Sequence, residues 1–307
     1  MYDAVLLVAF GGPRSPDEIA PFLAHVTEGR NIPPERLEEV RQNYLAVGGR
    51  SPLVEITFRQ AKRLEAELWF RGHHLPVYVG MRNWHPFLHD TLAIMQARRV
   101  HRAVGIILSP QRSPAGWDRY VEDVAAARTR IGRDAPVVDL VPSWHKHEGF
   151  HRAVACRVAQ TLAQVAEADR PQVPLIFTAH SLPVAMASKS PYVEQLENSA
   201  REIAARLRHE VWRLAFQSRS GPPSEPWLEP DISQCIAELA RSGAKTVVVA
   251  PIGFVADHVE ILYDLDVAAR ATAEQNGVQF LRAGTVGEHP AFIGMLADLV
   301  VAQLADG

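Results

Sequence analysis

Eight short apolar runs that alternate with amphipathic patterns constrain the fold of this chain more than any other feature. The runs cover residues 3–10, 77–81, 103–109, 137–141, 175–179, 214–217, 246–251 and 278–283. Between nearly all of them lie apolar residues at helical spacing, as in 51–68, 121–131, 149–166 and 195–208. Strands that alternate with helices indicate parallel sheets covered by helices. We therefore predict an α/β fold of two Rossmann-like halves, each a four-stranded parallel sheet flanked by helices.

The chain of 307 residues is long enough for two domains of ordinary size. Because the eight strands divide naturally as four and four, we predict an N-terminal Rossmann-like domain over residues 1–144 and a C-terminal one over residues 145–307. The last predicted helix, at about residues 290–305, could pack back on the N-terminal domain.

Charge and composition argue against nucleic acid as a partner. The chain has 32 basic and 35 acidic residues, a net charge of −3, and no block of lysine and arginine. A surface that binds a phosphate backbone needs a basic excess, which this sequence lacks. We expect no nucleic acid partner.

The cysteines and the N-terminus favour a cytoplasmic location. Cys156 and Cys235 lie 79 residues apart in helical patterns, which is typical of buried thiols in a reducing compartment. Two cysteines alone cannot hold an iron–sulfur cluster. The opening MYDAVLLVAF has no basic flank and reads as a strand, not a signal peptide. No apolar run approaches the roughly 18 residues of a membrane span, and a monomer is expected.

Two polar sites follow buried strands of the C-terminal half. Glu260 and Asp264 come after the strand at 246–251 and would share one face of a helix, and His180 follows the strand at 175–179. Taken singly, each has a structural explanation: a solvated helix face for the acids, and a satisfied core position for the histidine. Together they can converge in one crevice, because α/β sheets place ligands at the carboxyl ends of their strands. An imidazole and a carboxylate there suit acid–base chemistry or transient binding of a divalent metal.

Several ordered segments carry a resemblance to a known family. They are LLVAFGGP at 6–13, YLAVGGRSP at 44–52, AHSLP at 179–183, SPY at 190–192, FQSRSGPPSEPWLEPDI at 216–232 and PIGFVADHVEILYDLD at 251–266. With these segments, nearly the whole chain resembles the ferrochelatases, which insert Fe²⁺ into a porphyrin in haem biosynthesis. Neither common nucleotide-binding spacing, GxGxxG nor GxxxxGK[ST], is present.

The resemblance implies an enzyme, a lyase-type metal chelatase that needs no nucleotide and releases two protons from the porphyrin. Iron is then a substrate, no cofactor is permanently bound, and the C-terminal domain carries the metal site. The resemblance makes His180 and Glu260 the metal pair. It adds Asp264 as a further catalytic residue, in a line of acidic side chains along the predicted helix that begins with Glu260. The porphyrin contacts that it implies are Phe10, Ser51, Tyr120, Leu182 and Trp227.

Departures from the family pattern bear on which porphyrin is used. Coproporphyrin-using relatives carry a tyrosine where this chain has Phe10, and arginines where it has Thr27, Glu28 and Asn43. Fewer cations leave fewer partners for the four carboxylates of coproporphyrin III, so protoporphyrin IX is the favoured expectation. Two alternatives stay open: a chelatase for another divalent metal, and a non-catalytic porphyrin or haem-binding protein.

Overall fold

The computed structural model describes residues 1–29, 32–221 and 224–306 of the chain. Contacts divide it into two compact units. The first unit contains Met1–Ser109, Ala115–Ser143 and the C-terminal residues from Phe292 on, and the second contains Pro110–Pro114 and Trp144–Ala291.

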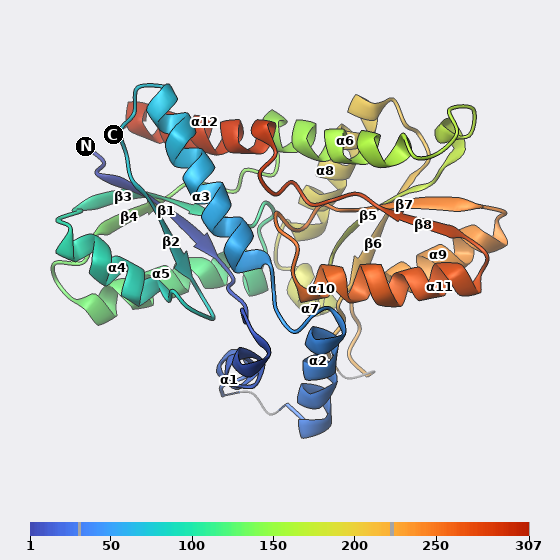
Figure 1. The fold of residues 1–307 in the computed structure, drawn as a ribbon, viewed down its shortest axis with the longest axis horizontal. Helices are drawn as coiled ribbons and strands as arrows, with labels where there is room; N and C mark the ends of the chain where they lie inside the picture. Colours follow the sequence, from blue (N-terminus) through green and yellow to red (C-terminus); the bar gives the residue numbers. More distant parts are fainter. Residues whose placement is uncertain (30–31, 222–223, 307) are drawn as a thin grey trace. The chain divides into compact units, whose positions relative to one another are not determined.

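The first unit is built on one parallel sheet of four strands in the order β2-β1-β3-β4. The strands are β1 (Ala4–Ala9), β2 (Val77–Met81), β3 (Arg102–Ile107) and β4 (Val137–Leu140). Every residue of the central strand β1 is buried, as expected for a strand with helices on both faces. Figure 1 shows these helices on the two faces: α3 (Leu53–Phe70) and α12 (Pro290–Asp306) on one, α4 (Leu88–Ala97) and α5 (Arg119–Ile131) on the other.

Two further helices of the first unit lie apart from its sheet (Figure 1). They are α1 (Pro16–Val26) and α2 (Pro34–Ala46). The rings of Phe22 and Tyr44 meet edge to face at 6.0 Å and join the two helices.

The second unit repeats the same arrangement, with a parallel sheet in the order β6-β5-β7-β8. Its strands are β5 (Leu175–His180), β6 (Trp212–Gln217), β7 (Thr246–Pro251) and β8 (Gln279–Arg282). Helices α6 (Glu148–Leu162) and α8 (Tyr192–Leu207) cover one face, and α9 (Ile232–Arg241) and α11 (Arg270–Gln275) cover the other (Figure 1). The remaining elements of the chain, from either unit, are η1 (Pro114–Asp118), η2 (Arg170–Gln172), α7 (Val184–Ala187), α10 (Val259–Leu262) and η3 (Asp264–Ala269).

The fold confirms the prediction of two four-stranded parallel sheets flanked by helices. Each of the eight apolar runs overlaps one strand. The match follows from burial on both faces, which makes strands of parallel sheets nearly continuous apolar runs and so visible in the sequence.

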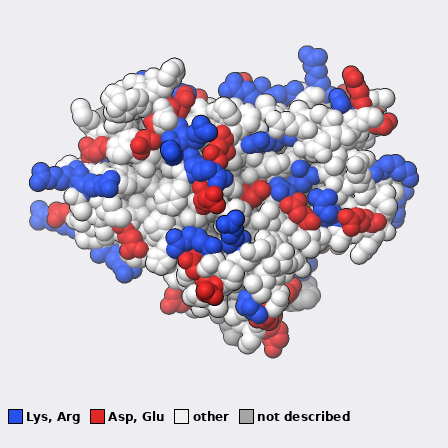
Figure 2. All heavy atoms as spheres, in the orientation of Figure 1, with Lys and Arg blue, Asp and Glu red and all other residues white. Residues whose placement is uncertain are grey.

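The surface carries both signs of charge. On the face drawn in Figure 2, Lys and Arg side chains are interspersed with Asp and Glu. Among the described residues, no helix combines the length and apolar character that crossing a membrane requires.

Candidate active site

His180 is the last residue of β5, at the carboxyl end of the second sheet. The backbone that follows β7 passes close beside it, because a Cβ on Gly253 would lie only 2.7 Å from Ala179 Cβ. Glycine therefore permits this close approach, and it brings the segment after β7 next to the end of β5. The two polar sites predicted from the sequence are thereby placed in one region.

The segment after β7 is not the single α-helix that the sequence predicted. It forms the four-residue α10 and then the π-helical η3, in which the Ala268 N–H donates to the Tyr263 carbonyl five residues back. The reason lies in the apolar spacing. Ile261, Leu265 and Ala269 recur every four residues and are all fully buried, whereas an α-helix would rotate such a stripe by about 40° at each step. Wider π-type turns keep the stripe on the core, while Glu260 and Asp264 stay partly exposed.

His180 and Glu260 meet at the centre of the site. His180 Nε2 lies 3.6 Å from Glu260 Oε1, and the two side chains are 30% and 35% exposed. Burial alone would lower the pKa of His180, but the nearby Glu260 carboxylate outweighs it and raises that pKa to about 9. Burial would likewise raise the pKa of Glu260, but the charge of His180 lowers it to about 2. At neutral pH the pair is therefore imidazolium and carboxylate.

Hydrogen bonds fix the orientation of the imidazole. His180 Nδ1 lies 2.5 Å from the Ser181 carbonyl, and a carbonyl can only accept, so Nδ1 carries a hydrogen. The Tyr192 hydroxyl donates to the His180 carbonyl at 3.0 Å. When the ring loses one proton, it is therefore Nε2 that holds the free lone pair, and Nε2 is the atom that faces Glu260.

Residues at the end of β6 form hydrogen bonds to the acidic segment, residues 257–266. The Gln217 side-chain amide donates to the Glu260 carbonyl at 2.5 Å, and the Ser218 hydroxyl donates to Asp264 Oδ2. Ser218 has φ 63°, a left-handed conformation that costs a non-glycine residue about 1–2 kcal/mol. Sequence reasoning did not single out these two residues, although they lie in the matched segment at 216–232 and at a strand end.

His258 is a second histidine of the site that sequence reasoning did not select. Its Nδ1 accepts from the Glu260 N–H at 3.2 Å and caps α10, and its ring packs against Phe254 at 4.6 Å. Burial lowers its pKa, so it stays neutral at pH 7. Its capping role fixes where α10 begins, and so where Glu260 stands.

Leu182 and Trp227, two of the predicted porphyrin contacts, lie in the same unit as His180. Both are nearly buried, at 6% and 9% exposure, and the Leu228 N–H donates to the Leu182 carbonyl at 2.9 Å. Residues 222–223 of the matched segment lie outside the described residues.

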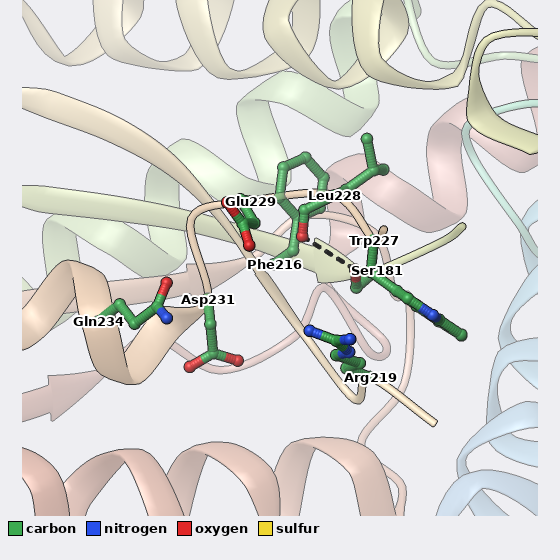
Figure 3. A pocket seen from close by; sticks show the side chains of 8 residues that line it. All are labelled: Ser181, Phe216, Arg219, Trp227, Leu228, Glu229, Asp231 and Gln234. Atoms are coloured by element: carbon green, nitrogen blue, oxygen red, sulfur yellow. Dashed lines mark hydrogen bonds between the residues drawn. The ribbon is translucent and has the colours of Figure 1, made fainter. Parts of the chain in front are cut away.

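A small cavity of about 40 Å³ adjoins Ser181 and Trp227. Figure 3 shows its lining and the hydrogen bond from the Ser181 hydroxyl to the Leu228 carbonyl, 3.0 Å long. The lining residues are Ser181, Phe216, Arg219, Trp227, Leu228, Glu229, Asp231 and Gln234. A volume of this order holds about one water molecule, so the cavity cannot take a porphyrin.

The other three predicted porphyrin contacts belong to the first unit. Phe10 is 38% exposed, directly after β1, whereas Ser51 and Tyr120 are buried. The Ser51 N–H donates to the Pro13 carbonyl, and the Arg82 guanidinium stacks over the Tyr120 ring at 5.6 Å. All three therefore have structural contacts of their own.

The described residues contain a pair of facing metal-ligating side chains but no larger group of them. Across residues 1–29, 32–221 and 224–306, no three or more His, Cys, Asp or Glu side chains form a group that could hold a metal ion. His180 and Glu260 are thus a pair of donors facing each other, and both cysteines are free thiols.

Comparisons with known proteins cover nearly the whole chain. The family model described as Ferrochelatase matches residues 2–304. A coproporphyrin III ferrochelatase of Mycolicibacterium smegmatis is 41% identical over 99% of this chain and 90% of its own length. One of Frankia alni is 45% identical over 97% of this chain and 79% of its own length. A ferrochelatase of Rhodopirellula baltica is 40% identical over 99% and 86%.

Solved structures share the fold at low sequence identity. SirB from Bacillus subtilis with Fe³⁺ has a TM-score of 0.58 at 10% identity, over 98% of this chain and 94% of that one. The sirohydrochlorin chelatase SirB from Bacillus subtilis subspecies spizizenii, in complex with cobalt, has a TM-score of 0.55 at 12% identity, over the same shares of the two chains. At such identities the likeness shows the fold alone.

Proposed function

The chain belongs to the ferrochelatase family of lyase-type enzymes, which insert iron into a porphyrin in haem biosynthesis, and we propose that His180 and Glu260 carry that reaction here. Iron is the substrate of this chemistry, and its arrival must be matched by the departure of two pyrrole protons.

The separation of 3.6 Å between His180 Nε2 and Glu260 Oε1 carries the proposal. A divalent metal about 2.1 Å from both a nitrogen and an oxygen ligand holds them roughly 3.4 to 3.7 Å apart in near-tetrahedral geometry. The pair can therefore share either one proton or one metal ion without a large movement. A site where a proton and a cation exclude each other suits an exchange of iron for protons.

The roles of the side chains follow from their hydrogen bonds. His180 acts through Nε2, because Nδ1 is committed to the Ser181 carbonyl. In its neutral form it accepts one of the two pyrrole protons while the Glu260 carboxylate presents the metal, and the second proton leaves to solvent by way of Asp264. Asp264, held by the Ser218 hydroxyl, lies on the same acidic line and passes protons or cations to or from the pair.

The porphyrin is proposed to contact the five residues that the resemblance names. Leu182, Trp227 and Phe10 offer apolar surface, and Ser51 and Tyr120 offer hydroxyls for carboxylates. A bent macrocycle would present its nitrogen lone pairs to the incoming metal, and binding contacts remote from the metal can supply that distortion.

Coproporphyrin III is the porphyrin that the relatives favour. Relatives at 41% and 45% identity are named for it, so the expectation of protoporphyrin IX, based on Phe10, Thr27, Glu28 and Asn43, has no support from them. Matches along nearly the whole chain outweigh four single positions, and we propose coproporphyrin III as the substrate. The monomeric state and the cytoplasmic location remain predictions.

Anaerobic metallation tests the function directly. Purified protein is mixed with Fe²⁺ and either coproporphyrin III or protoporphyrin IX, and the porphyrin absorption spectrum is followed. His180→Ala and Glu260→Ala should each lower kcat about 100-fold or more, the usual contribution of an acid–base group. Glu238→Ala is the matched control, because this half-exposed carboxylate pairs with Arg213 at the surface.

The outcomes separate the parts of the proposal. Full turnover in either site variant would refute the assigned roles of His180 and Glu260. Faster metallation of protoporphyrin IX would overturn the choice of porphyrin and leave those roles intact. Tight porphyrin binding without any metallation would instead favour the non-catalytic carrier.

A further inference from the structure

One buried guanidinium binds both ends of the segment that carries the active-site acids. Arg282, the last residue of β8, donates to Asp266 through Nε and Nη2 at 2.7 and 2.8 Å. The same guanidinium also contacts Asp257 through Nη1 and Nη2, both at 3.3 Å. Asp257 lies just before α10, and Asp266 lies in η3. Glu260 and Asp264 lie between these two anchors.

The ion pairs of Arg282 are less exposed to solvent than an ordinary surface ion pair. Its side chain is only 13% exposed, and those of Asp257 and Asp266 are 24% and 26% exposed. The surface pair of Arg213 and Glu238 is about half exposed on each side. A bidentate contact between a guanidinium and a carboxylate fixes the orientation of both groups and also pairs their charges.

The guanidinium is itself tied to the sheet. Arg282 is in register with Val249 of β7, and the next N–H, that of Ala283, donates to the Val249 carbonyl at 2.8 Å. The Thr285 hydroxyl donates to the Asp257 carboxylate at 3.0 Å. The two acidic anchors are therefore fixed against the rigid end of the second sheet.

The segment between the anchors needs such support. A four-residue α-helix followed by a π-helical stretch has little stability of its own. Four carboxylates within ten residues also repel one another. Arg282 binds two of them with one positive charge, which reduces this repulsion, and it leaves Glu260 and Asp264 free of its guanidinium.

We propose that Arg282 is a positioning residue for metal insertion: by holding Asp257 and Asp266 it fixes Glu260 against His180 and keeps the two outer carboxylates from competing for iron. This inference rests on the proposed roles of His180 and Glu260. Arg282 itself touches neither substrate nor metal.

Arg270 contacts the same segment but does not bind both Asp257 and Asp266 as Arg282 does. It is 40% exposed, its Nη2 lies 3.9 Å from Asp266 Oδ1, and its Nε donates to the Asp266 carbonyl. It therefore supports backbone and not the pair of carboxylates.

The test compares Arg282→Gln, Arg282→Lys and Asp266→Asn with the wild-type enzyme. The matched control is Arg213→Gln, which removes an arginine that contacts one carboxylate outside the segment. The KM for Fe²⁺ is measured anaerobically, and kcat is expressed per porphyrin-binding site, counted by fluorescence titration. Neither quantity changes when a variant merely contains less folded protein.

Arg282→Gln should lower kcat/KM for Fe²⁺ roughly 10- to 100-fold, the usual effect of losing a residue that orients a metal ligand. Arg282→Lys should fall in between, because lysine keeps the charge and loses the planar fork. Asp266→Asn, which keeps the shape of the side chain, should raise the KM for Fe²⁺ even if Arg282→Gln does not fold. Arg213→Gln should stay within twofold of wild type.

Unchanged KM for Fe²⁺ and unchanged kcat per site in Arg282→Lys and Asp266→Asn would overturn the inference. A wild-type enzyme that binds porphyrin and inserts no iron would instead refute the proposed function, so the two failures are distinguishable.

Discussion

Replacing Glu260 with glutamine should release the proton of His180 at a much lower pH. The carboxylate is what holds the pKa of His180 at about 9 against burial, which lowers it. Glutamine keeps the shape of the side chain and removes its charge. Burial is then opposed only by the hydrogen bond to the Ser181 carbonyl and the charge of Asp264, so the pKa of His180 should fall.

The size of the effect follows from the distance between the two side chains. At 3.6 Å, with an effective dielectric constant of about 20, Coulomb's law gives an attraction of about 4 to 5 kcal/mol. Solvent reaches about a third of each side chain and screens the pair, which reduces this to an order of 1 to 3 kcal/mol, or about one to two pH units. We therefore expect the pKa of His180 to fall by at least one pH unit in Glu260→Gln.

Stability should follow the same pair. A raised pKa at His180 stabilises the fold fully below pH 6.5, and this contribution is lost as pH rises through about 9. A lowered pKa at Glu260 stabilises it above pH 4.5, and this contribution is lost as pH falls through about 2. The difference in unfolding free energy between wild type and Glu260→Gln should therefore be largest between about pH 4.5 and 6.5.

The assay is a proton NMR titration of the histidine ring signals, with His180→Ala to identify the signal of His180. Urea unfolding at several pH values gives the stability difference. If His180 titrates within half a pH unit of its wild-type value in Glu260→Gln, the ion pair does not control its proton, and the metal–proton exchange argued from it is wrong.

Three further predictions address the site and its support. The rate kcat/KM for Fe²⁺ should rise with pH from 6 towards about 9 in an anaerobic pH profile, because His180 must lose its proton before it can act; a fall over that range would assign the reaction to the protonated ring. Gly253→Ala should destabilise the protein by about 1–3 kcal/mol and lower turnover, because the new Cβ would overlap Ala179, and a urea melt at wild-type stability would contradict this. Ile261→Ala, at a fully buried position, should cost about 2–5 kcal/mol of unfolding free energy, and a smaller loss in the same melt would mean that the core does not anchor α10.

The sequence determined the fold class and predicted two residues, His180 and Glu260, that the structure brings together. The strands of both sheets are buried on two faces, so their residues form apolar runs that can be recognised without any tertiary information. Placing His180 and Glu260 near each other needed only the rule that parallel strands end at the same edge. The family assignment rested on segments such as 179–183 and 251–266, and the comparisons confirmed it.

The shape of the acidic segment was decided only by tertiary structure. The same four-residue spacing of Ile261 and Leu265 can be written as an α-helical stripe, and only the fit to the sheet selects the wider turns of η3. Local sequence preference could not anticipate this, because a π-helical stretch is unfavourable alone and persists through contacts made elsewhere.

The partners of the acids also came from far along the chain. Gln217 reaches Glu260 across 43 positions, Ser218 reaches Asp264 across 46, and Arg282 reaches Asp257 across 25. No local pattern marks such residues, because a side chain that ends a strand becomes a partner only when the sheet sets the strands side by side. The sequence named the groups to which we assign the chemistry, and the tertiary structure determined which residues hold them in place and which nitrogen of His180 faces Glu260.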